Sequence, residues 1–315
     1  MTFKEKVASL RLLQYRYYCI SVSVVLFAAS IFVWVSRGES KFGIDFAGGS
    51  ELLVKLEKPI ELGELRKILS ENNYPGAIVQ GVGESVARTT GLSEVSIRVA
   101  NLSQGTSMPS VKQVVKEKWD ANLKVLREET VGPLLGKKIK RDGIFAFACS
   151  LIAVLIYIAF RFELRFSVGA VIALIHDGVI CTGVFLMTGG ELSSQVLAAV
   201  LTIVGYSLTD TIVIYDRVRE NLALAKSGKS KLKGESLFEL TDRSITQTLS
   251  RTMLTSVLTF LVVFILWLVG GEGLSDLAFT MTVGVVVGTY STIFVACPLM
   301  IWLASGSTNG AKAAT

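Results

Sequence analysis

Six long apolar runs constrain the fold of this chain more than any other feature. They lie at about residues 17–36, 143–160, 166–188, 195–215, 252–269 and 277–303. An apolar run of roughly 18 or more residues can cross a bilayer core of about 30 Å as a helix. Charged residues make up only 18% of the chain, against about a quarter in a typical soluble protein. We therefore predict an α-helical membrane protein with six transmembrane helices.

The first run is predicted to be an uncleaved membrane anchor. Basic residues precede it, as they would a signal peptide: Lys4, Lys6, Arg11 and Arg16. Its apolar stretch is longer than the core of a signal peptide, however, and no A-x-A cleavage site follows it. We accordingly expect residues 1–16 to form a cytoplasmic N-terminus and residues 17–36 to be the first span.

The basic residues between the runs predict the orientation in the membrane, because short cytoplasmic loops are rich in Lys and Arg. The loops at 189–194 and 270–275 contain neither residue type. The alternating loops are basic, with Arg161, Arg165, Arg217, Arg219, Lys226, Lys229, Lys231, Lys233 and Arg243. This pattern predicts cytoplasmic N- and C-termini and an extracytoplasmic segment 37–142. Lys137, Lys138, Lys140 and Arg141 disagree, since they would then lie outside, beside the second span.

Residues 37–142 are predicted to form the one sizeable soluble domain. Alternating polar and apolar residues indicate strands at 43–56 and 94–100, and more weakly at 77–82. Helical spacing of apolar residues indicates helices at 61–73 and 109–130. This mixture over about a hundred residues favours an α+β domain, which we assign to the ferredoxin-like type. Residues 143–303 would hold the other five spans, 103–107 a loop, and 304–315 a disordered cytoplasmic tail.

Several classes of function are disfavoured by what the sequence contains. Basic and aromatic residues do not interleave as in a nucleic-acid-binding surface, despite a net charge of +6. Cys19, Cys149, Cys181 and Cys297 all lie in apolar runs without metal-ligand spacing. The segment 227–230 resembles the end of a phosphate-binding loop, but Ala223 replaces its leading glycine. We therefore expect neither an enzyme nor a cofactor or metal site. Any work must be powered from elsewhere, and a titratable residue in a membrane span points to the proton gradient.

Asp210 is the most informative residue of the spans. An ionised carboxylate at the bilayer centre costs about 2.5–3.5 kcal/mol or more, so such residues are often functional. Polar residues share its helix face at Thr202, Tyr206, Ser207 and Arg217. The fifth run carries a matching polar stripe: Thr248, Arg251, Thr252, Thr255, Ser256 and Thr259. Two such stripes, with an acid and a base near one end, would suit a proton relay or an ion pair. Serine and threonine can also simply join helices.

Two further assignments stay open at this point. Asp177 in the third run adjoins His176, the one histidine of the chain. The two could form a satisfied structural pair or support proton movement. Arg251 could belong to the relay or be an anchor whose charged end reaches the membrane interface. The stripe Thr280, Gly284, Gly288 and Thr292 in the sixth run predicts close helix packing, and Pro298 predicts a kink or an early end of the helix.

Five segments resemble the SecF branch of the SecD/SecF family of protein-export membrane proteins, which belongs to the RND superfamily. They are FGIDFAGG at 42–49, VGPLLG at 131–136, ALIHD at 173–177, GYSLTDTIVIYDRVREN at 205–221 and GVVVGTYST at 284–292. They follow the family's order and extend over most of the chain, and the segment at 205–221 is long and specific.

The resemblance implies an RND-type half with six helices in a bacterial plasma (inner) membrane. It implies SecD as a pseudo-symmetric partner, the SecYEG channel and YajC as further partners, and unfolded secretory proteins as cargo drawn outward by the proton gradient. Asp210 matches the family's membrane acid and Arg251 a basic residue of the same path. His176, Asp177, Ser207, Thr209 and Thr255 would support them.

Two positions depart from the family pattern. Thr209 and Thr246 stand where the family usually has asparagine, which leaves the acid and the base in place but changes the hydration of the path. Two other functions are weighed against a proton-driven translocase subunit. One is a half-size RND exporter of small molecules, which the single small soluble domain disfavours. The other is a structural scaffold, for which Asp210 would be dispensable. A carboxylate could also serve Na⁺ instead of H⁺.

Overall fold

The computed structural model describes residues 11–72, 74, 77–81, 92–99, 108–119, 122–161, 164–227 and 235–311. The chain divides into two compact units. The helical unit comprises residues 11–38, 145–190 and 195–311 of the described chain, and the α/β unit comprises residues 39–144 and 191–194. The expected loop at 103–107, the basic residues at 229–233 and the last four residues of the expected tail lie outside the described residues.

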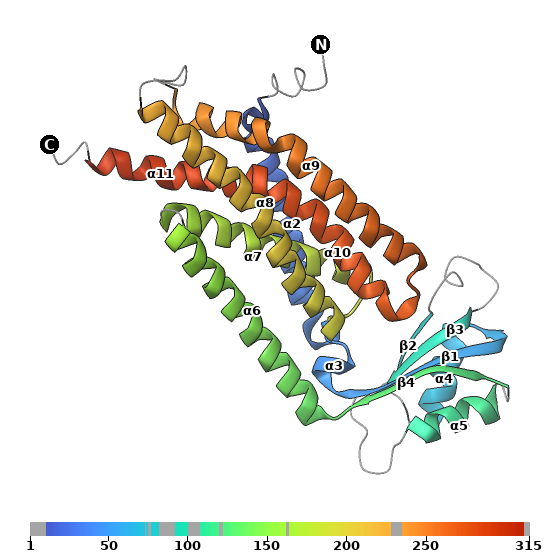
Figure 1. The fold of residues 1–315 in the computed structure, drawn as a ribbon. Coiled ribbons are helices and arrows are strands. Elements are labelled where there is room, and N and C mark those ends of the chain that lie inside the picture. The colour runs from blue at the N-terminus through green and yellow to red at the C-terminus, as the bar shows by residue number, and fades with distance from the viewer. Residues whose placement is uncertain are drawn as a thin grey trace. The chain divides into compact units, whose positions relative to one another are not determined.

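The prediction of six membrane-length apolar helices is confirmed (Figure 1). They extend over Leu12–Ser36, Pro133–Arg161, Phe166–Met187, Ser194–Lys226, Leu237–Val269 and Gly273–Ala304. The elements that form them are the 3₁₀ turn η1 (Leu12–Tyr15), α2 (Arg16–Ser36), α6 (Pro133–Arg161), α7 (Leu164–Met187), α8 (Ser194–Lys226), α9 (Leu237–Val269), α10 (Glu272–Ser291), the π-helical segment η4 (Thr292–Ala296) and α11 (Cys297–Ala311).

Helices α8 and α9 continue well beyond the apolar runs that predicted them. A capping box starts α9, in which Ser236 and Glu239 satisfy each other's backbone N–H groups. Asn221 donates a 2.7 Å hydrogen bond to the Ser244 hydroxyl, and so ties the polar ends of the two helices together. The predicted helices were too short at these ends, because an apolar run marks only the part of a helix that lies in the bilayer. Polar contacts between the two helices extend them beyond it.

The sixth span shows how Pro298 is accommodated. The helix does not end there; it changes to the π-helical segment η4 one turn earlier and continues as α11. Such a local widening is one way to lose the hydrogen bond that a proline nitrogen cannot donate. The Tyr215 hydroxyl donates to the Ala296 carbonyl at 3.0 Å. The tail expected to be disordered from residue 304 is helical as far as Ala311.

The α/β unit contains a four-stranded antiparallel sheet in the order β2-β3-β1-β4. Its elements are η2 (Gly38–Lys41), α3 (Ile44–Ala47), β1 (Gly49–Ile60), α4 (Leu62–Glu71), β2 (Ile78–Gly81), β3 (Leu92–Val99), α5 (Met108–Lys118) and β4 (Lys124–Val131). Helices α4 and α5 cover one face of the sheet (Figure 1), where apolar side chains such as Leu52, Leu65 and Val111 form the core. This βαββαβ sequence with its strand order is the ferredoxin-like arrangement.

Two secondary-structure predictions in this unit were wrong in part. The helix expected over 109–130 ends at Lys118, and Lys124–Val131 is the edge strand β4. β4 has helix-favouring residues, but its side chains alternate in burial and its backbone pairs with β1. Pairing with the open edge of β1 therefore overrides local propensity. The strand expected from residue 43 begins only at Gly49, because Ile44–Ala47 form one helical turn.

The glycines that end this turn make room for the start of α6. Gly48 has a φ of +76°, and a Cβ there would lie 2.7 Å from the Cα of Pro133. A Cβ at Gly136 would lie 2.9 Å from the Gly48 nitrogen. The structure thus packs the two glycine-containing segments 42–49 and 131–136 against each other.

The loop that joins α7 to α8 belongs to the α/β unit. The Leu192 N–H donates to the Lys41 carbonyl at 2.7 Å, and the Gly43 N–H donates to the Leu192 carbonyl at 2.9 Å. The Ser194 N–H donates to Oδ2 of Asp45 at 2.7 Å. The loop thus pairs with the segment that leads into β1, although about 150 residues of chain separate them.

A charged contact completes the attachment of this loop. Arg98 on β3 forms ion pairs with Glu191 of the loop and, at 2.8 Å, with Glu51 on β1. Burial lowers the pKa of Arg98, but the negative charges of Glu51 and Glu191 outweigh it and raise the pKa above its usual value. Glu191 is only 8% exposed, so water screens this pair much less than a surface pair.

We expect Glu191→Gln to loosen the loop. The change removes one charge from a largely buried pair, and losing a hydrogen bond to a charged group costs about 1–3 kcal/mol. Hydrogen exchange of the Gly43 and Leu192 amides in the purified protein measures the effect, and both should exchange faster. Glu94→Gln is the matched control, because Glu94 pairs with Lys55 in a more exposed contact that is worth about 0.2–1 kcal/mol. Equal protection in both variants would contradict the expected role of Glu191.

Candidate functional site

Asp177 on α7 is a buried acid with three side-chain hydrogen-bond contacts. The carboxylate is 1% exposed. Its Oδ2 accepts hydrogen bonds from Ser207 on α8 at 2.7 Å and from Ser291 on α10 at 2.8 Å. Its Oδ1 lies 3.0 Å from Nδ1 of His176. These four residues, here called the Asp177 cluster, join three membrane helices through one carboxylate.

Asp210 on α8 is buried too, but is held far more loosely. It is 6% exposed, and Ser256 on α9 donates to its Oδ2 at 3.4 Å, a long hydrogen bond. The Ser256 hydroxyl in turn contacts Tyr206 at 3.0 Å and Thr289 at 2.7 Å. We call Tyr206, Asp210, Ser256 and Thr289 the Asp210 cluster. Through Ser256 the acid is thus linked to further hydroxyl groups, each of which can both donate and accept a hydrogen bond.

The two clusters share helices α8 and α10. Ser207 and Asp210 are three residues apart on α8, so they lie on neighbouring turns of one face. Gly288 lets α10 approach there, because a Cβ at this position would lie 3.1 Å from the Ser207 Cβ. A Cβ at Gly284 would overlap the Ile203 side chain. This supports the prediction that the small-residue stripe of the sixth span serves close packing, and its packing partner is α8.

The contacts distinguish the two acids chemically. Asp177 has three side-chain hydrogen-bond contacts, so a change in its protonation would disturb three helices at once. Asp210 has one long contact to a side chain among the described residues. Because few hydrogen bonds would have to rearrange, Asp210 can gain and lose a proton more readily than Asp177. The geometry thus favours Asp210 as the titrating group and Asp177 as a structural junction.

Three residues expected at the site lie outside both clusters. Thr209 is exposed and donates to the Gly205 carbonyl of its own helix at 3.0 Å. Thr255 is exposed and donates to the carbonyls of Arg251 and Thr252. Arg251 is exposed too, and among the described residues it forms no ion pair with Asp210.

Sequence reasoning missed two members of the clusters on α10. Thr289 and Ser291 were not singled out, although Ser291 contacts Asp177 and Thr289 contacts Ser256. Tyr206 and Ser256 had been placed on the polar stripes without a role at the site. A signal existed, since hydroxyl residues are clustered at 289–292 within an apolar run. Nε2 of His176 is buried without a hydrogen-bond partner in the described part of the chain. Within the same residues, no group of three potential metal ligands occurs.

Two protein-family models match this chain, one over the membrane helices and one over the glycine-containing segment before β1. The model of "Protein export membrane protein SecD/SecF, C-terminal" matches residues 110–306, and that of the "SecD/SecF GG Motif" matches residues 41–60. The first match alone extends over more than half of the chain and includes both acidic clusters. This chain belongs to the SecD/SecF family.

Individual members of the SecD/SecF family match over nearly the full chain. The protein translocase subunit SecF of Desulfurispirillum indicum is 40% identical, with 91% of this chain and 89% of the relative covered. The subunit of the same name from Thermodesulfovibrio yellowstonii is 34% identical, with 93% and 94% covered.

A solved structure gives the fold of a longer SecD/SecF relative. The crystal structure of SecDF from Thermus thermophilus, a translocon-associated membrane protein, matches with a TM-score of 0.81 and 34% identity. The match covers 95% of this chain but 39% of SecDF. A second SecDF structure, in a super-membrane-facing form, gives a TM-score of 0.68. The chain thus has the fold of one part of SecDF, an RND-type half, and spans about two fifths of its length.

Proposed function

We propose that this chain is an accessory subunit of the Sec protein translocase that works with SecD and uses the proton motive force to promote late steps of protein export. Membership in the SecD/SecF family supports the export role. The observation that carries the proton-driven part is Asp210, a membrane-buried acid whose one long hydrogen bond, to Ser256, connects it with the hydroxyl groups of Tyr206 and Thr289. A carboxylate buried in the membrane with few hydrogen bonds destabilises the fold, so its presence indicates a functional role.

An exposed polar face in the membrane helices supports SecD as the partner. Thr202, Gly205 and Thr209 lie exposed on α8, and Arg251 and Thr255 lie exposed on α9. A charged side chain such as that of Arg251 is costly to expose to lipid and normally faces protein or water. The matched SecDF chain is more than twice as long as the part that this chain resembles. We propose that SecD covers this face, and that SecYEG, YajC and unfolded secretory proteins are further partners, as the family resemblance implies.

Complementation tests this function. Cells depleted of their own SecF are given this chain together with its SecD, and the conversion of a secretory precursor to its mature form is followed. We expect the pair to restore conversion. If the precursor still accumulates while both chains are present in the membrane, the export function is wrong. A changed sensitivity to small amphipathic toxins, with no effect on export, would favour a small-molecule exporter.

We further propose that both termini are cytoplasmic and that the α/β unit is extracytoplasmic. The basic loops support this orientation. The conflicting charges near the start of α6 are partly compensated, since Arg141 pairs with Asp142 and Lys140 lies 3.8 Å from Glu39 and over the Phe42 ring.

Cysteine labelling measures the orientation. In a variant without the four native cysteines, Lys116→Cys on α5 should react with a membrane-impermeant maleimide in intact spheroplasts. Ser227→Cys, which follows α8, should react only after lysis. Both positions are exposed, so each is the control for the other. The reverse pattern would invert the proposed topology.

A further inference from the structure

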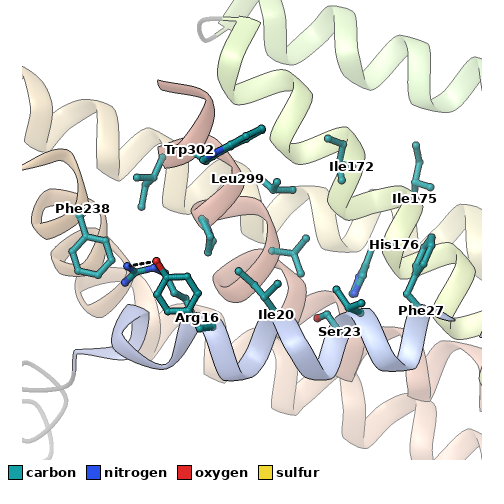
Figure 2. A pocket seen from close by; sticks show the side chains of 15 residues that line it. Arg16, Ile20, Ser23, Phe27, Ile172, Ile175, His176, Phe238, Leu299 and Trp302 are labelled. Carbon is teal, nitrogen blue, oxygen red and sulfur yellow. Dashed lines mark hydrogen bonds between the residues drawn. The ribbon is translucent and has the colours of Figure 1, made fainter. Parts of the chain in front are cut away.

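A pocket in the helical unit lies apart from the Asp210 cluster and meets the Asp177 cluster at His176. Its volume is about 740 Å³, and it is lined by side chains of α2, α7, η4, α11 and the start of α9 (Figure 2). Pockets that hold small ligands measure about 300–1,000 Å³. Apolar side chains dominate the lining, and its strongly polar members are Arg16, Ser23 and His176. An apolar molecule with a small polar part would match this lining.

One end of the pocket is positively charged. The Arg16 guanidinium lies 4.4 Å from the centre of the Tyr17 ring and 4.6 Å from that of Phe238, so aromatic rings fix its position. It donates to the Leu13 carbonyl and the Tyr17 hydroxyl at 3.2 Å each. An arginine has five N–H donors, and in the described chain Arg16 has no acidic partner. Several N–H groups therefore remain for an anion.

The other end of the pocket lies further along α2, toward the middle of the membrane. Phe27 and His176 form it, with their rings stacked at a centroid distance of 6.2 Å (Figure 2). Arg16 and Phe27 are eleven residues apart on α2, or roughly 16 Å at 1.5 Å per residue. A bilayer core measures about 30 Å, so the pocket has the depth of one leaflet. Tyr17 and Trp302 line it as well, and such aromatic side chains are typical of the membrane interface.

We propose that this pocket binds one anionic phospholipid, with its phosphate at Arg16 and an acyl chain between α2, α7 and α11. The guanidinium fork matches a phosphate in shape and charge. The apolar lining and leaflet depth match an acyl chain. A transmembrane helix of another protein is a poorer fit. The surface of such a helix within the membrane is apolar and would leave the Arg16 guanidinium without an anion.

Native mass spectrometry of the full chain, purified with SecD and exchanged into mild detergent, tests the proposal. Dioleoyl phosphatidylglycerol is the anionic probe, and dioleoyl phosphatidylethanolamine is the zwitterionic one. We expect the wild type to retain one phosphatidylglycerol at least tenfold more tightly than phosphatidylethanolamine. Arg16→Gln should remove this preference. Arg11→Gln should keep it, because Arg11 carries the same charge nearby but does not line the pocket.

A second pair of variants tests the acyl-chain part and does not depend on Arg16. Ile20→Trp fills the pocket from α2 and should reduce retention of both lipids. Val25→Trp adds the same bulk at an exposed position of α2 outside the lining and should not. Equal retention of the two lipids by the wild type, or unchanged phosphatidylglycerol binding in both Arg16→Gln and Ile20→Trp, would overturn the proposal. Release of a co-purified peptide from the pocket would overturn it as well. None of these readouts depends on export activity.

Discussion

Asp210→Asn is expected to reduce export to the level of cells that lack the chain, even when the variant inserts and assembles normally. The amide keeps the size of the side chain and can still accept the hydrogen bond from Ser256, but it cannot take up or release a proton. Conversion of a secretory precursor, compared at equal membrane levels of wild type and variant, measures the effect.

Asp216→Asn is the matched control for this prediction. Asp216 is six residues later on the same helix, but it is half exposed and pairs with Arg161 and Arg219. Pairs of this kind contribute about 0–1 kcal/mol, so we expect export close to that of the wild type. Full export by Asp210→Asn would mean that the acid is dispensable, and a scaffold role would then replace the proton-driven one.

Asp177→Ala is expected to destabilise the helical unit by about 3–5 kcal/mol. The substitution leaves His176, Ser207 and Ser291 without their shared acceptor in a buried site, and removing one partner of a buried charged contact costs this much. Unfolding of the purified protein in detergent, followed by heat or denaturant, measures the loss.

Ser291→Ala tests how much one hydrogen-bond donor contributes to stability compared with the Asp177 carboxylate itself. It removes one of the three contacts and leaves the carboxylate with two, so we expect a smaller loss of about 1 kcal/mol. A stable Asp177→Ala variant that nevertheless fails in export would contradict the structural role and make Asp177 a member of the proton path.

The membrane part of the fold was predictable because its signal is local. Apolar length alone gave the six spans, since a bilayer imposes one minimum length on every helix that crosses it. The errors in the α/β unit arose where distant contacts decide. Lys124–Val131 is a strand because β1 offers an open edge, and nothing in the local spacing of that segment shows that edge.

The candidate site was predictable to the extent that buried charge is rare in membrane spans. Asp177 and Asp210 stand out for this reason. His176 and Ser207 were predicted as supporting residues because His176 adjoins Asp177 in the sequence and Ser207 shares a helix face with Asp210. Thr289 and Ser291 were missed because only the approach of α10 to α8 at Gly284 and Gly288 brings them to the acids. Thr209 and Thr255 were expected near Asp210, yet they lie on the exposed side of their helices, and helical spacing alone does not reveal which side a neighbour covers.

The account depends most on the claim that Asp210 moves protons. The chain and its SecD can be placed in liposomes with a pH-sensitive dye inside, and the decay of an imposed pH difference followed with sodium absent. We predict that wild type and Asp216→Asn speed the decay relative to empty liposomes, whereas Asp210→Asn leaves it at the empty rate. Equal decay with wild type and Asp210→Asn, both faster than empty liposomes, would contradict the claim. So would a wild type that moves ions only when a sodium gradient is supplied.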